Sequence, residues 1–202
     1  APHAMVTDGF GSSEAGAQGA MRVAAGEGSA GSSLVRFNQP TKPTIVVDVD
    51  GRKVVPGSGT VGQVLAGGHL PVGYYNDPER TAATFVERED GRWLITGDMA
   101  TVGADGAIEL LGRGSGAINT GGEKVFPEEV EGVLKAYPAV YDCLVVGVDD
   151  DRWGSAVTAV VQLVPGTSVS LEDLVTHWKA TLAGYKAPTH LAIVDAIVRS
   201  PS

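Results

Sequence analysis

Apolar residues recur at three- and four-residue spacing in two segments of the chain, and this spacing is typical of helices that bury one face. The first segment covers residues 127–137, with apolar positions at Val130, Val133, Leu134 and Tyr137. The second begins with a capping box at residues 170–173, and we expect it to reach Leu182 with Trp178 on its buried face. The pattern predicts two amphipathic helices in the second half of the chain.

Runs of β-branched and other apolar residues predict strands in the same half. They cover residues 143–148, 155–164 and 190–198. Three consecutive Asp residues at 149–151 separate the first two runs, and we interpret them as a solvated turn because they lack the spacing of an EF-hand calcium loop. Together with the two helices, these runs predict α/β alternation.

The first half of the chain is predicted to be mostly β. Short apolar runs such as 44–49 and 61–65 are separated by Gly, Pro, Asn and Asp. Asp105-Gly106 predicts a hairpin between residues 99–102 and 108–111. One helix is expected over residues 77–87, with Asn76 or Asp77 as its cap and Pro78 at its first position.

A glycine-rich stretch at residues 112–131 joins these two halves. Glycines 112, 114 and 116 flank Arg113, residues 121–124 (Gly-Gly-Glu-Lys) form a tight turn with one cation, and Pro127 starts a helix. The acids that follow Pro127 suit the positive end of the helix dipole. The stretch predicts a joint between two domains, with chemistry at the joint.

Composition narrows the classes of function. The 202 residues are 43% hydrophobic, which suffices for a sizeable core in one or two domains. A net charge of −9 argues against a nucleic-acid-binding surface, which needs clustered Lys and Arg. The single cysteine, Cys143, fits a reducing cytoplasm, and no apolar run approaches the roughly 18 residues of a membrane span. The four histidines share no zinc-ligand spacing.

Residues 8–14 (Asp-Gly-Phe-Gly-Ser-Ser-Glu) are the first candidate for chemistry. We expect a loop whose glycines let the backbone approach a ligand. Phe10 offers a ring for stacking, Ser13 a hydroxyl for a phosphate oxygen and Glu14 a carboxylate for a hard cation. The same composition also fits a Gly/Ser-rich surface turn.

Two further segments need weighing. Residues 57–62 match Gly-x-Gly-x-x-Gly, but a dinucleotide fingerprint requires a helix there, and Gly67, Gly68 and Pro71 interrupt it, so we reject that interpretation. Residues 93–98 (Trp-Leu-Ile-Thr-Gly-Asp) predict a strand that ends at an exposed Asp98. A carboxylate there could accept two vicinal hydroxyls, or Asp98 could be an ordinary turn residue.

Taken in order, these segments resemble motifs of the adenylate-forming acyl-CoA ligases. Residues 8–14 resemble the motif Tyr/Phe-Gly-x-Thr/Ser-Glu, and residues 62–81 resemble a Gly-Glu-Leu strand leading to Gly-Tyr and Pro-Glu-x-Thr, with Gln63 in place of the usual Glu. Residues 93–98 match Trp-x-x-Thr-Gly-Asp, and residues 112–131 match Gly-Arg followed by Pro-x-Glu-Val-Glu. Residues 184–188 resemble the segment before the last motif of the family.

The resemblance implies a site for ATP and AMP formed by Asp8, Gly9, Phe10, Gly11, Ser13, Asp98 and Arg113. In such a site Phe10 contacts adenine, Asp98 holds the ribose hydroxyls and Glu14 binds Mg²⁺. The implied catalytic residues are Glu14, Ser13 and Arg113.

The resemblance also implies a coenzyme A site at Gly121, Gly122 and Lys124, and a hinge at Ser115. Many relatives have Asp or Lys at the Ser115 position and Asp at the Gly116 position. This chain has neither charge and departs from the family's pattern at both positions.

The fold implied by the resemblance is α+β. Residues 1–112 would close a large AMP-binding domain with a β-barrel-like part, residues 113–116 would be the hinge, and residues 117–202 would form a small mobile domain. The family's phosphate loop would precede Ala1 and its catalytic Lys would follow Ser202, and Lys186 is misplaced to replace that Lys. We therefore expect the isolated chain to be inactive in adenylation.

The implied reaction of the intact enzyme converts ATP, a carboxylic acid and coenzyme A into acyl-CoA, AMP and pyrophosphate through an acyl-adenylate. The variant Asn-Thr-Gly-Gly-Glu-Lys-Val-Phe-Pro at residues 119–127 is similar to that of bacterial activators of fatty acids and steroid side chains. This implies a cytoplasmic enzyme and is compatible with a homodimer and with peripheral membrane contact. The alternatives are a non-catalytic nucleotide-binding or interaction module derived from such an enzyme, or an adenylation domain for another carboxylate.

Overall fold

The computed structural model describes residues 5–24, 35–38 and 40–198, and these residues divide into two compact units. Among them, the first unit ends at Gly114 and the second begins at Ser115. A single 3₁₀ turn, η1 (Gly114–Gly116), spans this boundary. The boundary lies within the segment 113–116 that the sequence indicates as a hinge, and the hinge motion stays a prediction.

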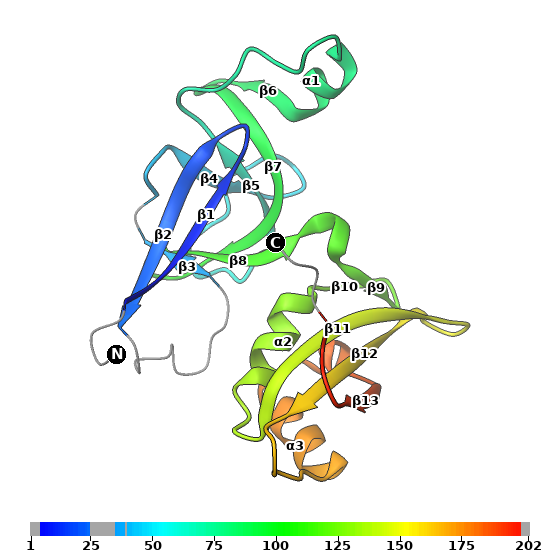
Figure 1. Ribbon diagram of the computed structural model, residues 1–202. Helices are drawn as coiled ribbons and strands as arrows, with labels where there is room; N and C mark the ends of the chain where they lie inside the picture. The colour runs from blue at the N-terminus through cyan, green and yellow to red at the C-terminus, as the bar shows by residue number, and fades with distance from the viewer. Residues whose placement is uncertain (1–4, 25–34, 39, 199–202) are drawn as a thin grey trace. The chain divides into compact units, whose positions relative to one another are not determined.

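An antiparallel sheet forms most of the first unit (Figure 1). Its strands have the order β3-β8-β7-β5-β4, and β6 pairs with β7. The bounds are β3 (Arg36–Phe37), β4 (Thr44–Val47), β5 (Gly62–Ala66), β6 (Phe85–Arg88), β7 (Gly91–Val102) and β8 (Ile108–Arg113). The expected strands at 44–49 and 61–65 are therefore confirmed within two residues. β7 pairs with β5, β6 and β8 and is the central strand of the unit.

Two strands at the start of the chain form a separate hairpin. β1 (Met5–Ser12) pairs antiparallel with β2 (Gly16–Ala24), with a register shift between Phe10 and Gly11. The expectation that residues 8–14 form a loop is wrong for residues 8–12, because backbone pairing with β2 outweighs the low β propensity of glycine. Only residues 13–15 form the turn. A Cβ at Gly11 would lie 2.5 Å from the carbonyl oxygen of Gly16, so the close approach requires glycine.

The helix expected near residue 77 is present as α1 (Pro78–Thr84). The Asp77 side chain caps it by accepting a hydrogen bond from the Arg80 backbone N–H at 2.9 Å, and Pro78 occupies the first turn as predicted. The helix ends three residues earlier than expected. Phe85 is buried and pairs with Leu94 as the first residue of β6, so strand pairing and burial outweigh helix propensity there.

The hairpin predicted at Asp105-Gly106 connects β7 to β8, as expected. The expectation that the strand ends at Asp98 is wrong, because β7 continues to Val102 and pairs with β8 beyond Asp98. Gly97, with φ of +81°, and a register shift between Met99 and Ala100 produce an irregularity on either side of Asp98. Asp98 therefore lies within a strand and directly opposite Arg113.

The second unit combines a hairpin, a three-stranded sheet and two helices. The hairpin is β9 (Ile118–Thr120) and β10 (Glu123–Val125), followed by α2 (Pro127–Lys135). The sheet has the order β11-β12-β13, with β11 (Val140–Asp150) antiparallel to β12 (Gly154–Leu163) and β12 parallel to β13 (His190–Val194). α3 (Leu171–Thr181) and the 3₁₀ turn η2 (Gly184–Lys186) lie between β12 and β13 in the chain.

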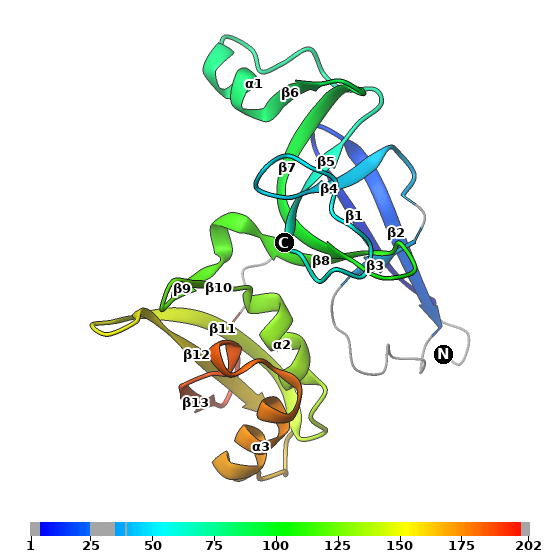
Figure 2. The same cartoon turned by 180° about the vertical axis from the view of Figure 1, so that it is seen from behind.

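α2 and α3 cover one face of this sheet, as both views show (Figures 1 and 2). Alternate residues of β11 and β12 face the helices and form one buried core with them; its members include Cys143, Val145, Val157, Val161, Val130, Leu134, Leu174 and Trp178. The apolar faces predicted for the two helices are thus confirmed. So is the capping box, in which Ser170 Oγ accepts a hydrogen bond from the Asp173 backbone N–H at 3.0 Å.

The bounds of β11 and β13 differ from expectation, and β11 begins at Val140, three residues before the expected start. β11 includes Asp149 and Asp150, so the Asp-rich turn is shorter than predicted, because Asp150 pairs with Gly154 on β12. β13 stops at Val194, where its pairing with β12 ends at Gln162. None of the helices in the described part of the chain has the length and apolar composition that a membrane crossing requires.

Candidate functional site

The turn between β1 and β2 presents the first candidate residues. Ala15 is buried, and the Ser12 hydroxyl oxygen accepts its backbone N–H at 3.1 Å. Lys42 Nζ donates a hydrogen bond to the Ala15 carbonyl oxygen. Ser13 is exposed at the tip. The turn is thus held at its base, while the predicted phosphate-binding hydroxyl faces solvent.

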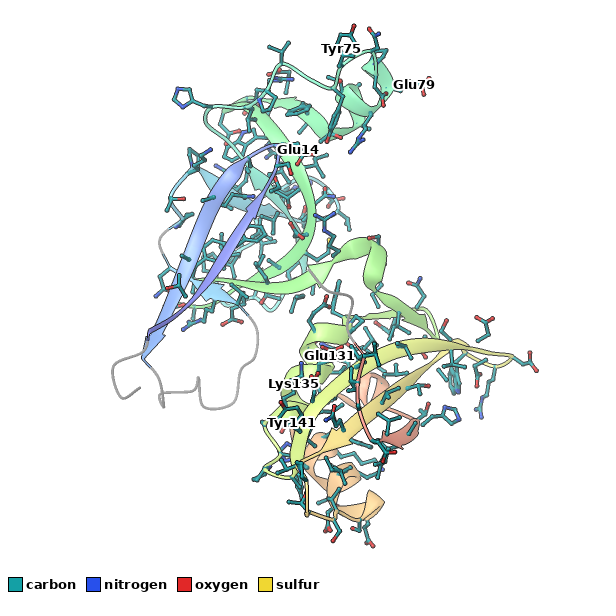
Figure 3. The ribbon with its side chains drawn as sticks, in the orientation of Figure 1. Glu14, Tyr75, Glu79, Glu131, Lys135 and Tyr141 are labelled. Carbon is teal, nitrogen blue, oxygen red and sulfur yellow. The ribbon has the colours of Figure 1, made fainter. Side chains whose placement is uncertain are left out.

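Glu14 lies at the tip of the same hairpin and is half-buried (Figure 3). The Tyr74 hydroxyl donates a hydrogen bond to Glu14 Oε1 at 2.7 Å. This hydrogen bond is the main cause that lowers the pKa of the Glu14 carboxyl, followed by the backbone of Glu14 itself, with smaller contributions from Ser12 and Arg80, while burial opposes the shift. Glu14 is therefore held as a carboxylate.

The surroundings of Glu14 fit a Mg²⁺ ion that is held partly by the protein and partly by a nucleotide. The described residues contain no group of three or more acidic, histidine or cysteine side chains that could hold a metal alone. Mg²⁺ commonly uses one or two carboxylates together with substrate phosphates and water. One ionised carboxylate at an exposed turn suits a cation that arrives with a nucleotide.

The residues just before this turn are arranged differently from expectation. The Phe10 ring stacks on Phe37, with ring centroids 5.6 Å apart and an interplanar angle of 22°, so the protein already covers one face of the ring. Gly9 is exposed, with no atom within 4 Å of the position of an added Cβ. The side chain of Asp8 lies outside the described residues.

Asp98 and Arg113 meet across the β7–β8 pair. Arg113 Nε lies 3.7 Å from Asp98 Oδ1; the side chain of Arg113 is 68% exposed, and that of Asp98 is only 15% exposed. Burial raises the pKa of the Asp98 carboxyl, while the Thr96 hydroxyl and the Arg113 charge oppose the shift. The structure thus places a largely buried acceptor beside an exposed cation.

The other residues predicted from the sequence belong to the second unit. Ser115 lies in η1. Gly121 and Gly122 form the two-residue turn between β9 and β10, with φ of +58° and +86°, as a hairpin of this length requires. Lys124 lies on β10 rather than in the turn, exposed and opposite Asn119.

A cavity of about 320 Å³ lies beside this turn in the second unit. Its walls are mainly apolar, and the lining residues are Thr120, Gly121, Glu123, Trp153, Ala156, Val157, Gly184, Tyr185, Ala187 and Thr189. Trp153 and Tyr185 are each 46% exposed, and the Gly121 backbone N–H donates to the Trp153 carbonyl oxygen at 2.9 Å. The predicted turn therefore forms one wall of a cavity with two accessible aromatic rings.

Sequence reasoning did not identify Trp153 or Tyr185 as site residues. Each has a cation beside its ring, with Arg152 4.6 Å from the Trp153 centroid and Lys186 5.7 Å from that of Tyr185. Adjacent Arg-Trp and Tyr-Lys pairs in turns were the available signal. Lys186 Nζ also contacts both Glu129 carboxylate oxygens, at 2.6 and 2.8 Å, and so fixes η2 to the first turn of α2.

Comparison with known proteins accounts for this combination of features. Residues 129–202 match the family model of the AMP-binding enzyme C-terminal domain. All of the chain aligns, at 48% identity, with 36% of a medium/long-chain-fatty-acid–CoA/3-oxocholest-4-en-26-oate–CoA ligase from Mycolicibacterium smegmatis. The chain belongs to the adenylate-forming enzymes. These matches confirm the family resemblance, and the sheets and helices of the structure confirm the α+β class.

Other members of the adenylate-forming enzymes align in the same way. A 3-oxocholest-4-en-26-oate–CoA ligase from Rhodococcus rhodochrous is 48% identical over the whole chain and 36% of its own length. The crystal structure of ATP-bound MatB from Rhodopseudomonas palustris has a TM-score of 0.75 and 27% identity, and the alignment covers 96% of this chain and 38% of MatB. The chain thus spans about a third of the length of the relatives it matches.

Proposed function

We propose that this chain forms part of an acyl-CoA synthetase that activates a fatty or steroid-derived carboxylic acid. The carboxylate would attack the α-phosphate of ATP, forming acyl-adenylate and releasing pyrophosphate, and the thiol of coenzyme A would then displace AMP to give the thioester. The two 48% identical ligases, which align over the whole chain, are the observation that carries this proposal. We also propose a cytoplasmic location, where ATP and coenzyme A are both available.

The first unit would hold the nucleotide. Asp98 would accept the ribose hydroxyls, since a carboxylate oxygen pair can accept two O–H donors. The exposed Arg113, beside Asp98, would contact the ribose and phosphate side and meet negative charge on the phosphoryl oxygens. Ser13 would donate to a phosphate oxygen. Mg²⁺, when bound at Glu14, would neutralise phosphate charge.

Phe10 and its neighbours would complete the nucleotide site. One face of the Phe10 ring packs on Phe37, so adenine would contact the opposite face or the ring edge. Gly9 and Gly11 would let the backbone approach the base, and Asp8 would lie near its amino group.

The second unit would hold coenzyme A. Its cavity offers two exposed rings for a flat heterocycle, with Gly121 at its wall and Gly122 and the exposed Lys124 close by in the same hairpin. A cation on β10 suits the phosphates of the coenzyme. Movement at Ser115 would exchange the face used for adenylation with the one used for thioester formation.

The direct test of the proposal is a graft. This chain replaces the segment that it matches in the Mycolicibacterium smegmatis ligase, and thioester formation from a fatty acid, ATP and coenzyme A is measured. We expect activity in the graft. A folded graft that binds AMP and coenzyme A without making acyl-adenylate would contradict the proposal and favour a non-catalytic binding module.

The coenzyme site is tested in the 202-residue chain itself. Of its three tryptophans, Trp93 and Trp178 are buried and Trp153 is half-exposed, so quenching of fluorescence by coenzyme A would report mainly on Trp153. Stacking of a base on an aromatic ring is worth about 1–3 kcal/mol, so calorimetry should show that Trp153→Phe retains most of the affinity and that Trp153→Ala loses about 5- to 150-fold. Tyr141→Ala, exposed but outside the cavity lining, is the matched control.

A further inference from the structure

Tyr74 is the main partner of Glu14, and it lies in a different part of the first unit. The two residues are 60 positions apart, yet the Tyr74 hydroxyl donates to Glu14 Oε1 at 2.7 Å. A hydroxyl hydrogen bond to one carboxylate oxygen restricts rotation of the carboxylate and leaves the second oxygen for another partner. The contact therefore restricts the orientation of the Glu14 carboxylate at the hairpin tip.

Tyr74 is itself held from several sides. Its backbone N–H donates to Thr81 Oγ1 at 2.9 Å, and the Thr81 hydroxyl donates to the Asp77 carbonyl oxygen at 2.7 Å. The Arg80 guanidinium lies 4.0 Å from the centroid of the Tyr74 ring, and the centroids of the Tyr74 and Phe85 rings are 6.0 Å apart. Backbone, ring and hydroxyl are thus all engaged before any ligand is present.

The turn that carries Tyr74 is tightly packed against the start of α1. A Cβ at Gly73 would lie 2.6 Å from Thr81 Cγ2, so the chain approaches the helix as closely as glycine permits. Asp77 caps the same helix through the Arg80 backbone N–H. The segment from Gly73 to Thr81 therefore forms a stiff support.

Glu14, by contrast, lies in a three-residue turn at the end of a hairpin. The hydrogen bond between Ser12 and Ala15 stabilises the base of that turn, and Tyr74 makes the hydrogen bond that affects the carboxylate most. The hydrogen bond from Tyr74 thus links the Glu14 carboxylate to the stiff segment of residues 73–81. Tyr75, the next residue, is 93% exposed and lies beside α1, some way from Glu14 (Figure 3).

We propose that Tyr74 is a positioning residue for nucleotide-bound Mg²⁺, because it orients the Glu14 carboxylate and supports it from the α1 segment. This inference rests on the proposed function. It assigns a role in the first half-reaction to residues 73–81, a segment in which the sequence analysis names no catalytic or binding residue. The second half-reaction, which uses acyl-adenylate and coenzyme A, needs no Mg²⁺ bound at Glu14 and should not depend on Tyr74.

The test compares Tyr74→Phe with Tyr75→Phe in the grafted ligase. Both variants remove one hydroxyl, but only the first removes a hydrogen bond to Glu14. Loss of an outer-shell partner typically costs about 10–100-fold in metal affinity or activity. We expect the Mg²⁺ concentration for half-maximal acyl-adenylate formation to rise about tenfold in Tyr74→Phe and to stay unchanged in Tyr75→Phe.

Two further measurements separate positioning from a structural role. The first is the rate of thioester formation from supplied acyl-adenylate and coenzyme A. This rate reports the amount of correctly folded enzyme, and it should be equal in both variants. The second is the affinity for ATP, measured by calorimetry in the absence of a carboxylic acid, once with Mg²⁺ and once with a chelator. The increase in ATP affinity that Mg²⁺ causes should be smaller in Tyr74→Phe and unchanged in Tyr75→Phe.

A double variant completes the test. Glu14→Gln removes the carboxylate, and adding Tyr74→Phe to it should cause little further loss, since the hydroxyl acts through Glu14. Additive losses, or equal Mg²⁺ dependence in Tyr74→Phe and Tyr75→Phe, would overturn the inference. An inactive graft without either substitution would instead count against the proposed function.

Discussion

The candidate nucleotide residues of the first unit already have partners within the protein, whereas the candidate coenzyme residues of the second unit border an open cavity. Glu14 accepts a hydrogen bond from Tyr74, Asp98 lies beside Arg113 and Phe10 stacks on Phe37. In the second unit, Trp153 and Tyr185 expose nearly half of their surfaces. The difference suggests that the first unit provides oriented charge and the second provides accessible apolar surface.

The interiors of the two units differ as well. Among the residues that the structure describes, the buried side chains of the first unit fall into three small clusters, and those of the second unit form one core between its sheet, α2 and α3. Because the described part of the second unit has one core, the loss of a large buried side chain weakens the packing of the sheet, α2 and α3 at the same time.

Leu134→Ala should produce the largest difference in stability between the two units. Leu134 is fully buried on α2 in the core of the second unit, and such truncations cost about 2–5 kcal/mol. Hydrogen exchange followed by mass spectrometry should show lost protection in residues 115–198 and native protection in the first unit. Leu134→Met is the control, since volume-conserving changes cost less than about 1.5 kcal/mol. Equal loss in both units would show that they unfold together.

Gly121→Ala should have an intermediate effect, confined to the second unit. Gly121 has φ of +58°, and an added Cβ would lie 3.0 Å from Trp153 Cε3. The left-handed conformation alone costs a non-glycine residue about 1–2 kcal/mol, and the Trp153 ring must shift to make room. Urea unfolding should show this destabilisation, and the chain's affinity for coenzyme A should fall.

The matched control for that change is Gly116→Ala. An added Cβ at Gly116 meets no atom within 4 Å, and its φ lies outside the left-handed region. Its stability should change by less than about 0.5 kcal/mol. If both glycine variants behave alike, the cavity wall does not depend on the conformation of Gly121.

The two candidate carboxylates should respond to pH with opposite signs. The pKa of Glu14 lies below its ordinary 4.5 in the folded protein, so its contribution to stability is present above that pH and is lost as the pH falls through the lowered pKa. The pKa of Asp98 lies above 3.8, so its ionisation lowers stability as the pH rises through the raised pKa.

Urea unfolding from pH 3 to pH 7 tests this difference. Going from acidic to neutral pH, Glu14→Gln should lose stability relative to the unsubstituted chain, and Asp98→Asn should gain it. The same sign in both variants would show that burial does not govern the pKa of Asp98.

Arg113→Ala should have the smallest effect on stability. The ion pair with Asp98 is 3.7 Å long and Arg113 is mostly exposed, and such pairs are worth about 0–1 kcal/mol. In the grafted ligase, however, the affinity for ATP should fall clearly, while Arg113→Lys, which keeps the charge, should lose less. A large loss of stability with unchanged ATP affinity would make Arg113 a structural residue.

Local patterns in the sequence predicted much of the fold. The capping residues Asp77 and Ser170, the apolar faces of α2 and α3 and the hairpin turn at 105–106 all depend on neighbours within a few positions. The predictions fail where backbone pairing with a neighbouring strand, rather than the propensity of the residues themselves, decided the outcome. Residues 8–12 joined β1, and β7 continued past Asp98, because backbone partners on β2 and β8 were available.

The same division holds for the candidate site. The sequence by itself determined which residue types could bind nucleotide and coenzyme, and that Gly121 and Gly122 make a tight turn, because steric restrictions on the backbone are local. Only the tertiary structure decided that Tyr74 supports Glu14 and that Trp153 and Tyr185 line the cavity beside Gly121. Contacts between residues tens of positions apart depend on how strands and helices pack, and a one-dimensional pattern does not contain that information.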